Sequence, residues 1–161
     1  MNLEVLQENA NKYKAAKGLV FLGEPTIFTP ILVYRRDYKT SFYPGCLDLP
    51  GGNTDEFDPD VFLAFQREMH EEFGMLVMRN QIICAQEHVG QPKKSDKNVL
   101  PSLLLSASIN PEEIEYFERG DEGSDHCAMP LLRFLTHDDV IPAQRERVID
   151  LSCALGILSV L

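Results

Sequence analysis

Residues 67–74 have the sequence Arg67-Glu68-Met69-His70-Glu71-Glu72-Phe73-Gly74. Apolar side chains recur every three or four residues in and before this segment, at Phe62, Phe65, Met69 and Phe73. This spacing predicts a helix from residue 60 to residue 73, because such positions share one face of a helix. Asp58 is the predicted N-cap, Pro59 suits the first turn, and Gly74 is predicted to end the helix.

Three glutamates gather on one side of this predicted helix. Glu68 and Glu72 lie one turn apart and Glu71 lies on the adjacent flank, so the carboxylates fall within a sector of roughly 100°. Like charges at this spacing destabilise a bare helix, but a hard divalent cation would neutralise them. A solvated acidic face is the simpler alternative. Gly51-Gly52 favours the cation, since glycine lets the backbone approach a ligand closely.

The segments around the helix predict a mixed sheet flanked by helices. Apolar runs typical of strands occupy residues 18–23, 29–35, 81–89 and 99–109. A short amphipathic helix that ends near Gly18 and a closing helix over residues 143–161 are also predicted. Strands and helices mixed without regular βαβ alternation favour an α/β domain.

Length and composition predict a single folded domain. The chain has 161 residues, of which 44% are hydrophobic and 25% charged, as in ordinary globular proteins. Its net charge of −10 disfavours binding to a nucleic acid duplex or an anionic membrane. The N-terminus has no basic leader and residues 153–161 are too short to span a membrane, so a cytoplasmic protein is expected. No CxxC pair occurs, and buried reduced thiols are predicted for Cys46, Cys84, Cys127 and Cys153.

Gly51-Gly52 together with residues 67–75 resembles the Nudix box, G-x5-E-x7-R-E-U-x-E-E-x-G-U, where U is aliphatic. Eight specified positions at roughly one in fifteen each give a chance match on the order of 10⁻⁹. The box departs from this pattern at Asp58, which replaces the first Glu and is separated from Arg67 by eight residues, not seven. Residues 51–58 resemble the GG-x-x-D-x-x-D variant of the coenzyme A pyrophosphatase branch, which has the same extra residue.

The flanking sequence is similar to that branch in spacing more than in identity. Residues 32–52 align without gaps on the branch motif, but Tyr34, Asp37 and Ser41 replace its Thr, Ser and Arg. These replacements predict that coenzyme A, with its anionic 3′-phosphate, is a weak substrate. The resemblance covers residues 18–135. Residues 1–17 are therefore expected to be an N-terminal extension of one Nudix domain that spans residues 1–161.

The resemblance implies an α/β/α fold, with a mixed sheet between helices, and hydrolysis of a nucleoside diphosphate linked to another group X. It implies Mg²⁺ or Mn²⁺ as the cofactor and a small nucleotide-type diphosphate as the partner; a homodimer is compatible with it. Glu68 is implied to be a metal ligand or the general base, and Arg67 to orient the glutamates. Further implied metal ligands are Glu71, Glu72, the Gly51 carbonyl and Glu122, and the candidates for substrate binding are Tyr34, Arg35 and Arg36.

Two alternative functions stay open. One is a catalytically quiet Nudix domain that binds a nucleotide as a sensor, and the other is a true coenzyme A pyrophosphatase. Isomerisation of a prenyl diphosphate would need a catalytic cysteine in a defined context, which we do not identify. His88 could be a base that reaches into the site, and the lysines at 93, 94 and 97 could meet outer phosphates, although a strand-end histidine and a solvated basic loop are the simpler interpretation. His70 is expected to face solvent.

Overall fold

A computed structural model of the chain describes residues 3–89, 99–112 and 125–159. Within these residues, one seven-stranded sheet has the order β3-β2-β1-β6-β5, with β4 paired to β1 and β7 paired to β2. Strands β1 (Ala15–Leu22) and β6 (Ser102–Ile109) run parallel, whereas the other paired strands are antiparallel. The remaining elements are β2 (Pro30–Arg35), β3 (Leu47–Asp48), β4 (Gly51–Asn53), β5 (Ile82–His88), β7 (Asp125–Pro130), α1 (Val61–Phe73), α2 (Leu131–Thr136), α3 (Pro142–Ala154) and the short 3₁₀ helices η1 (Leu3–Gln7), η2 (Ala10–Lys12) and η3 (Arg79–Gln81).

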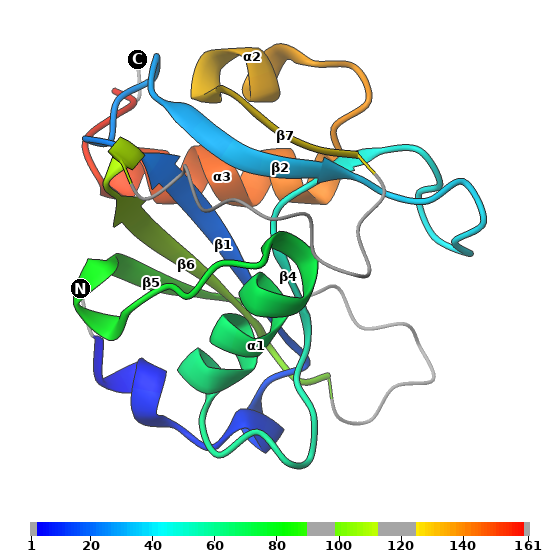
Figure 1. Cartoon of the computed structure of the whole chain (residues 1–161), viewed down its shortest axis with the longest axis vertical. Coiled ribbons are helices and arrows are strands. Elements are labelled where there is room, and N and C mark those ends of the chain that lie inside the picture. The colour runs from blue at the N-terminus through cyan, green and yellow to red at the C-terminus, as the bar shows by residue number, and fades with distance from the viewer. Residues whose placement is uncertain (1–2, 90–98, 113–124, 160–161) are drawn as a thin grey trace.

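The sheet separates two apolar cores, because alternate side chains of each strand point to opposite faces. In β6, Leu103 and Leu105 pack in the core that α1 covers, whereas Leu104 packs in the core that α2 and α3 cover. Figure 1 shows α1 and α3 on either side of the central strands. The predicted α/β/α arrangement with a mixed sheet is therefore confirmed. Apolar side chains from α1 fill the first core, namely Val61, Phe62, Phe65, Met69 and Phe73.

Helix α1 has the predicted end but a different N-cap. Gly74 ends it in the left-handed region at φ 63°. The N-cap is Asp60, whose side chain accepts a hydrogen bond from the Leu63 amide at 2.9 Å, so the prediction of Asp58 was wrong. The reason is that the Asp58 carboxylate is bound to Arg67 on the same helix.

The predicted amphipathic helix at the N-terminus is replaced by η1 and η2, and β1 begins at Ala15, before Gly18. The Asn9 side chain caps η2 and interrupts any longer helix. Val5, Leu6 and Tyr13 are nevertheless buried in the core beside α1. These three side chains therefore contribute to the core that α1 covers.

Two other expectations are corrected. The closing helix ends at Ala154, short of the predicted residue 161, and Gly156 follows in the left-handed region. Of the four cysteines predicted to be buried, Cys84 is buried, but Cys127, on β7, is exposed. Cys46 and Cys153 are partly buried. Among the described residues, no helix is both long enough and apolar enough to cross a lipid bilayer.

Candidate active site

Arg67 is the centre of a network that joins the acidic side of α1 to the preceding loop. Its guanidinium donates to Glu68 at 2.8 Å and to Glu71 at 3.0 Å through the same nitrogen, Nη1. Its other two nitrogens bind the Asp58 carboxylate in a bidentate pair at 3.1 and 3.0 Å. Hydrogen bonds to Asp58, together with those to Glu68, raise the pKa of Arg67 above its ordinary value despite partial burial. Arg67 therefore holds two of the three glutamates.

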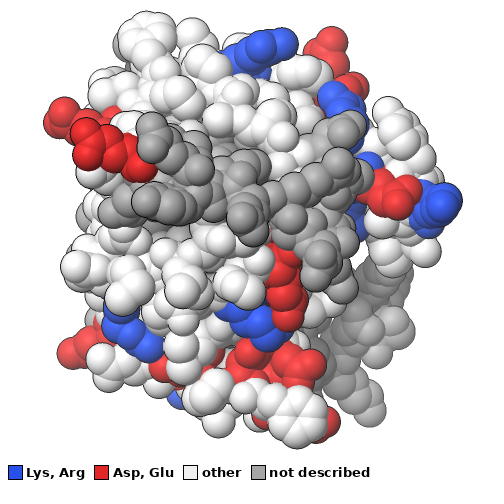
Figure 2. Space-filling model, in the orientation of Figure 1, with Lys and Arg blue, Asp and Glu red and all other residues white. Residues whose placement is uncertain are grey.

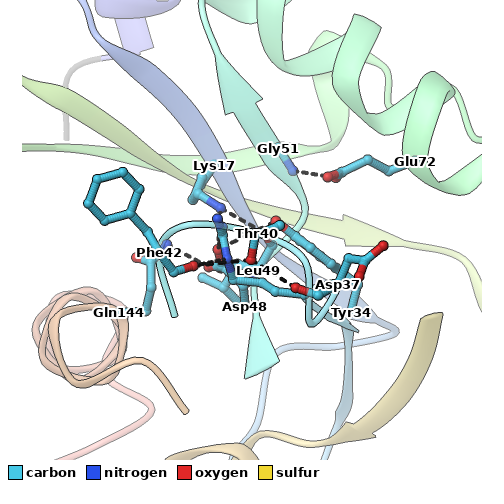
Figure 3. Close-up of polar contacts among 11 residues, drawn as sticks. Lys17, Tyr34, Asp37, Thr40, Phe42, Asp48, Leu49, Gly51, Glu72 and Gln144 are labelled. Carbon is cyan, nitrogen blue, oxygen red and sulfur yellow. Dashed lines mark hydrogen bonds and ion pairs between the residues drawn. The ribbon is translucent and has the colours of Figure 1, made fainter. Parts of the chain in front are cut away.

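The Gly51-Gly52 pair forms strand β4 and lies against the same glutamates. The Gly51 amide donates to Glu72 Oε2 at 2.8 Å (Figure 3). A Cβ on Gly52 would lie 2.3 Å from Glu68 Oε2, so a larger residue there would displace that carboxylate from its present position. In this structure the amide of Gly51, rather than its carbonyl, contacts a glutamate.

Two of these carboxylates lie in an environment that disfavours their charge. Burial raises the pKa of Glu72 to about 7, against the lowering effects of the Gly51 amide and of Lys17. Burial also raises the pKa of Glu68, although Arg67 acts in the opposite direction. A carboxylate in such a setting gains much from a nearby cation.

The donor set fits a hard divalent cation. Each of Glu68, Glu71 and Glu72 has one oxygen engaged by Arg67 or Gly51, and the described residues give its second oxygen no hydrogen bond. Carboxylate oxygens are the ligands that Mg²⁺ and Mn²⁺ prefer. Within the described part of the chain, no three acidic, histidine or cysteine side chains are already gathered around one point. Turning of the glutamate side chains is therefore needed to bring a third ligand to one ion.

Asp48 is the centre of a second polar network, on the opposite side of β1 (Figure 3). Its side chain is almost fully buried and accepts hydrogen bonds from Lys17 at 2.7 Å and from Arg36 at 3.1 Å. Gln144 of α3 donates to it at 2.8 Å. Burial alone would raise the pKa of Asp48, but the charge and hydrogen bond of Lys17, with the bond from Gln144, hold it below its ordinary value.

The three candidates for substrate binding are engaged within the protein. Tyr34 Oη lies 3.4 Å from Asp48, and burial together with the charges of Asp48 and Glu72 raises the pKa of its hydroxyl. Arg36 pairs with Asp48, and Arg35 pairs with Asp139 at 2.8 Å. Arg35 also donates to the Gly45 carbonyl. These contacts hold the loop over residues 36–46, so both arginines have a structural role here.

Replacement of Asp48 by Asn is expected to destabilise the protein by about 2 kcal/mol, because Lys17 and Arg36 lose the buried charge that neutralises them. Urea unfolding at pH 7 would measure this. Since the pKa of Asp48 is lowered on folding, its stabilising effect is present above its unfolded pKa and is lost as the pH falls through the folded pKa. The difference between the two proteins should therefore shrink in acid.

Asp139→Asn is the matched control for this substitution. Asp139 also pairs with an arginine, but its side chain is 49% exposed, against 2% for Asp48. Surface ion pairs contribute little to stability. An equal loss of stability in both variants would contradict the view that burial makes the Asp48 network important.

Other residues singled out in the sequence are placed as follows. Glu122 and the lysines at 93, 94 and 97 lie outside the described residues. His88 is the last residue of β5, and His70 is exposed on α1, as expected. Sequence reasoning missed Lys17, Asp48 and Gln144. The available signals were a single Lys in an apolar strand and an Asp just before Leu49-Pro50-Gly51-Gly52.

No model of a known protein family matches the chain, and no curated protein matches it significantly. Several solved structures are similar to the chain in fold. The MutT protein from Methanosarcina mazei Go1 superposes with a TM-score of 0.64 at 16% identity, over 88% of this chain and 93% of that one. The NUDIX domain of Shewanella oneidensis NrtR, complexed with ADP ribose, gives a TM-score of 0.61 at 13% identity, over 96% and 94%.

A third similar structure is the bifunctional NMN adenylyltransferase/ADP ribose pyrophosphatase from Francisella tularensis, complexed with AMP and a Mn ion. It gives a TM-score of 0.63 at 17% identity over 92% of this chain, which spans only 42% of the Francisella protein. At such identities, structural likeness establishes the fold. These superpositions show that the chain has the Nudix fold.

Proposed function

We propose that the protein is a metal-dependent pyrophosphohydrolase that cleaves a nucleoside diphosphate linked to another group X. The observation that carries this proposal is the arrangement of Glu68, Glu71 and Glu72 beside the Gly51-Gly52 backbone, with Arg67 holding two of them. Carboxylates on one side of a helix that can turn toward one ion, on this fold, suit a site for a cation and a diphosphate. The similar Francisella structure was solved with AMP and a Mn ion, which supports the same class of ligand.

Mg²⁺ or Mn²⁺ held by Glu71 and Glu72 would neutralise the phosphate oxygens and lower the pKa of the attacking water. In the reaction, a water oxygen forms a bond to one phosphorus of the diphosphate while the bridging P–O bond breaks. Glu68 accepts the proton of that water, and the two products each carry a phosphate. Arg67 keeps Glu68 and Glu71 oriented through charge-assisted hydrogen bonds.

ADP-linked compounds are the substrates that we favour. The NrtR domain, which superposes along almost its whole length, was solved with ADP ribose. Coenzyme A is disfavoured, since Asp37 places a negative charge in the exposed loop where the coenzyme A branch has Ser. The other possibility is a nucleotide sensor without activity, but an intact set of Arg67 and three glutamates disfavours it.

A hydrolysis panel tests the proposal. The purified chain is incubated with Mg²⁺ or Mn²⁺ and ADP-ribose, NADH, dinucleoside polyphosphates, nucleoside triphosphates, dephospho-coenzyme A and coenzyme A, and phosphorylated products are separated by chromatography. We expect metal-dependent cleavage, with a higher kcat/KM for ADP-ribose than for coenzyme A. Tight binding of a nucleotide without any cleavage would favour the sensor, and a preference for coenzyme A would favour the coenzyme A pyrophosphatase.

Glu68→Gln is expected to lower kcat by about 100-fold, with KM changed only a few-fold, because the amide cannot accept the proton of the attacking water. Steady-state kinetics at saturating Mg²⁺ would measure both constants. Glu146→Gln is a control that removes the same charge from an exposed position of α3. An unchanged kcat in Glu68→Gln would assign the base to another residue.

A further inference from the structure

Lys17 is a cation in the central strand whose ammonium has one donor to spare. It lies in β1 between Ala16 and Gly18, which are both buried. Its Nζ donates to Asp48 Oδ2 at 2.7 Å and to the Leu49 carbonyl at 3.3 Å. An ammonium has three donors, and within the described part of the chain the third makes no hydrogen bond. Lys17 can therefore bind one further anionic oxygen without giving up either contact.

The polar network around Asp48 has an excess of positive charge. The Asp48 carboxylate faces two cations, Lys17 and Arg36, and no other acidic side chain of the described residues forms an ion pair with either. The side chains of Lys17 and Arg36 are only 17% and 23% exposed, so salt screens their charges less than it screens surface charges. On the face shown in Figure 2, by contrast, most basic side chains lie next to acidic ones. An anion from outside the chain would neutralise this excess.

Lys17 lies level with the glutamates of the candidate active site. It is the register partner of Gly51, whose amide binds Glu72. Tyr34 lies between the two places, because its ring centre is 5.7 Å from Lys17 Nζ, and burial together with the charges of Asp48 and Glu72 raises its pKa. Burial raises the pKa of Glu72, and the Gly51 amide and the charge of Lys17 oppose this effect. The ammonium and the glutamates are therefore close enough for one diphosphate to reach both.

A cavity of about 190 Å³ gives a ligand access to Lys17. Lys17 and Gln144 line it, together with the start of β6. A cavity needs only about 10–15 Å³ to hold one water molecule, so this one has room for a phosphoryl group. Gln144 donates its amide nitrogen to Asp48 at 2.8 Å and so fixes the carboxylate that holds Lys17 at the edge of the cavity.

We propose that Lys17 is a further catalytic residue, whose ammonium donates a hydrogen bond to a non-bridging oxygen of the diphosphate during hydrolysis. This proposal rests on the proposed function. As the bridging P–O bond breaks, negative charge gathers on the departing phosphate, and a fixed cation beside it stabilises that charge more than it stabilises the intact substrate. Lys17 transfers no proton in this step. Asp48 and Gln144 are positioning residues, because they hold the ammonium and do not touch the diphosphate.

Calorimetric titration of the full chain in EDTA tests the contact without chemistry and without a metal ion. The probe is adenosine 5′-(α,β-methylene)diphosphate, whose bridging methylene prevents cleavage, and adenosine is the reference ligand. We expect Lys17→Gln and Lys17→Met to weaken binding of the probe at least 10-fold and to leave binding of adenosine unchanged. Lys14→Gln removes the same charge from an exposed residue just before β1, and should change binding of the probe less than 2-fold.

A purely structural role for Lys17 would give a different result. Asp48→Asn breaks the same ion pair but leaves the ammonium in place, so binding of the probe should stay within 3-fold of the wild type. The titrations are made at a temperature at which circular dichroism shows every variant to be folded. Equal weakening in Lys17→Gln and Asp48→Asn, equal weakening in Lys17→Gln and Lys14→Gln, or no binding by the wild type would each overturn the proposal.

Steady-state kinetics on the best substrate of the hydrolysis panel test the catalytic role. We expect Lys17→Gln to lower kcat about 10-fold and to raise KM about 10-fold, whereas Lys17→Arg, which keeps the charge, should lower kcat/KM less than 10-fold. An unchanged kcat in Lys17→Gln would overturn the catalytic role while the proposed function stands. If the wild type cleaves no compound of the panel, the proposed function fails, and the titrations in EDTA still decide whether Lys17 contacts a diphosphate.

Discussion

Glu72→Gln is expected to lower kcat about 1,000-fold while the protein stays folded. The substitution removes one charged ligand from the cation, and such a ligand contributes several kcal/mol to stabilisation of the transition state. The amide oxygen of Gln can still accept the hydrogen bond that the Gly51 amide donates at 2.8 Å. Glu71→Gln should act in the same direction. Kinetics and Mg²⁺ titration on both variants would measure the losses, and a near-normal kcat at low Mg²⁺ would contradict the assignment of the ligand.

Glu72→Gln should also make the metal-free protein more stable than the wild type at high pH. Because burial raises the pKa of Glu72 to about 7, the folded protein binds a proton there that the unfolded chain has released above its ordinary pKa. Stability therefore falls as the pH rises from about 4.5 to 7. Gln has no charge to bury, so we expect Glu72→Gln to exceed the wild type by about 1–3 kcal/mol at pH 8 and to match it at pH 4.

Urea unfolding in EDTA at both pH values would measure this difference. Glu146→Gln is the control, since Glu146 is exposed on α3 and its replacement should change neither activity nor the dependence of stability on pH. A Glu72→Gln protein that is inactive and also less stable at pH 8 would mean that the loss of activity reflects damage to the fold. Loss of activity with a gain in stability is the expected result for a functional carboxylate.

Gly51→Ala is expected to destabilise the protein by about 3 kcal/mol or more. Gly51 has φ 108°, which an alanine adopts only with strain, and its Cβ would lie 2.3 Å from the Ala16 carbonyl oxygen. That atom belongs to the backbone of the central strand, so it cannot move aside without breaking the pairing of β4 with β1. Thermal and urea unfolding would measure the loss, and activity should fall with it because the Glu72 contact depends on this strand.

Gly156→Ala provides the matched control. Gly156 also has a positive φ, 72°, but nothing lies within 4 Å of the position that its Cβ would take. The cost there is limited to backbone strain of roughly 1–2 kcal/mol. If the two variants lost the same stability, the contact of Gly51 with β1 would add nothing and the explanation of the Gly51-Gly52 pair would be wrong.

The sequence predicted the parts of the structure that depend on local pattern. The apolar spacing through Phe65 and Phe73 located α1, and the apolar runs located four strands. Elements of two or three residues, such as β3 and β4, have no pattern of their own, because distant strands determine them. Asp58 and Asp60 are equally good N-caps by composition, and the choice depends on Arg67, which binds Asp58.

In the candidate site, too, only the features that depend on local pattern could be predicted. The glutamates are neighbours on one helix, so periodicity alone groups them. The Asp48 network instead joins a residue before Gly51-Gly52 to Lys17 and to Gln144 of α3. Nothing in local sequence relates these three residues, since only the folded sheet brings them together. Arg35 and Arg36 illustrate the limit, because the sequence showed two cations but not the carboxylates that pair with them.

The parallel pairing of β1 with β6 also constrains how the protein folds. Ala15 pairs with Ser102, so the central strand acquires its longest partner only after the chain between them has been made. Contacts between residues so far apart close slowly, because a long loop must be ordered before the strands gain their hydrogen bonds. During synthesis on the ribosome, β1 and α1 would emerge before β6 and would expose apolar surface until it arrives. Refolding is therefore expected to be slow for a chain of this size, and aggregation should compete with it at high protein concentration.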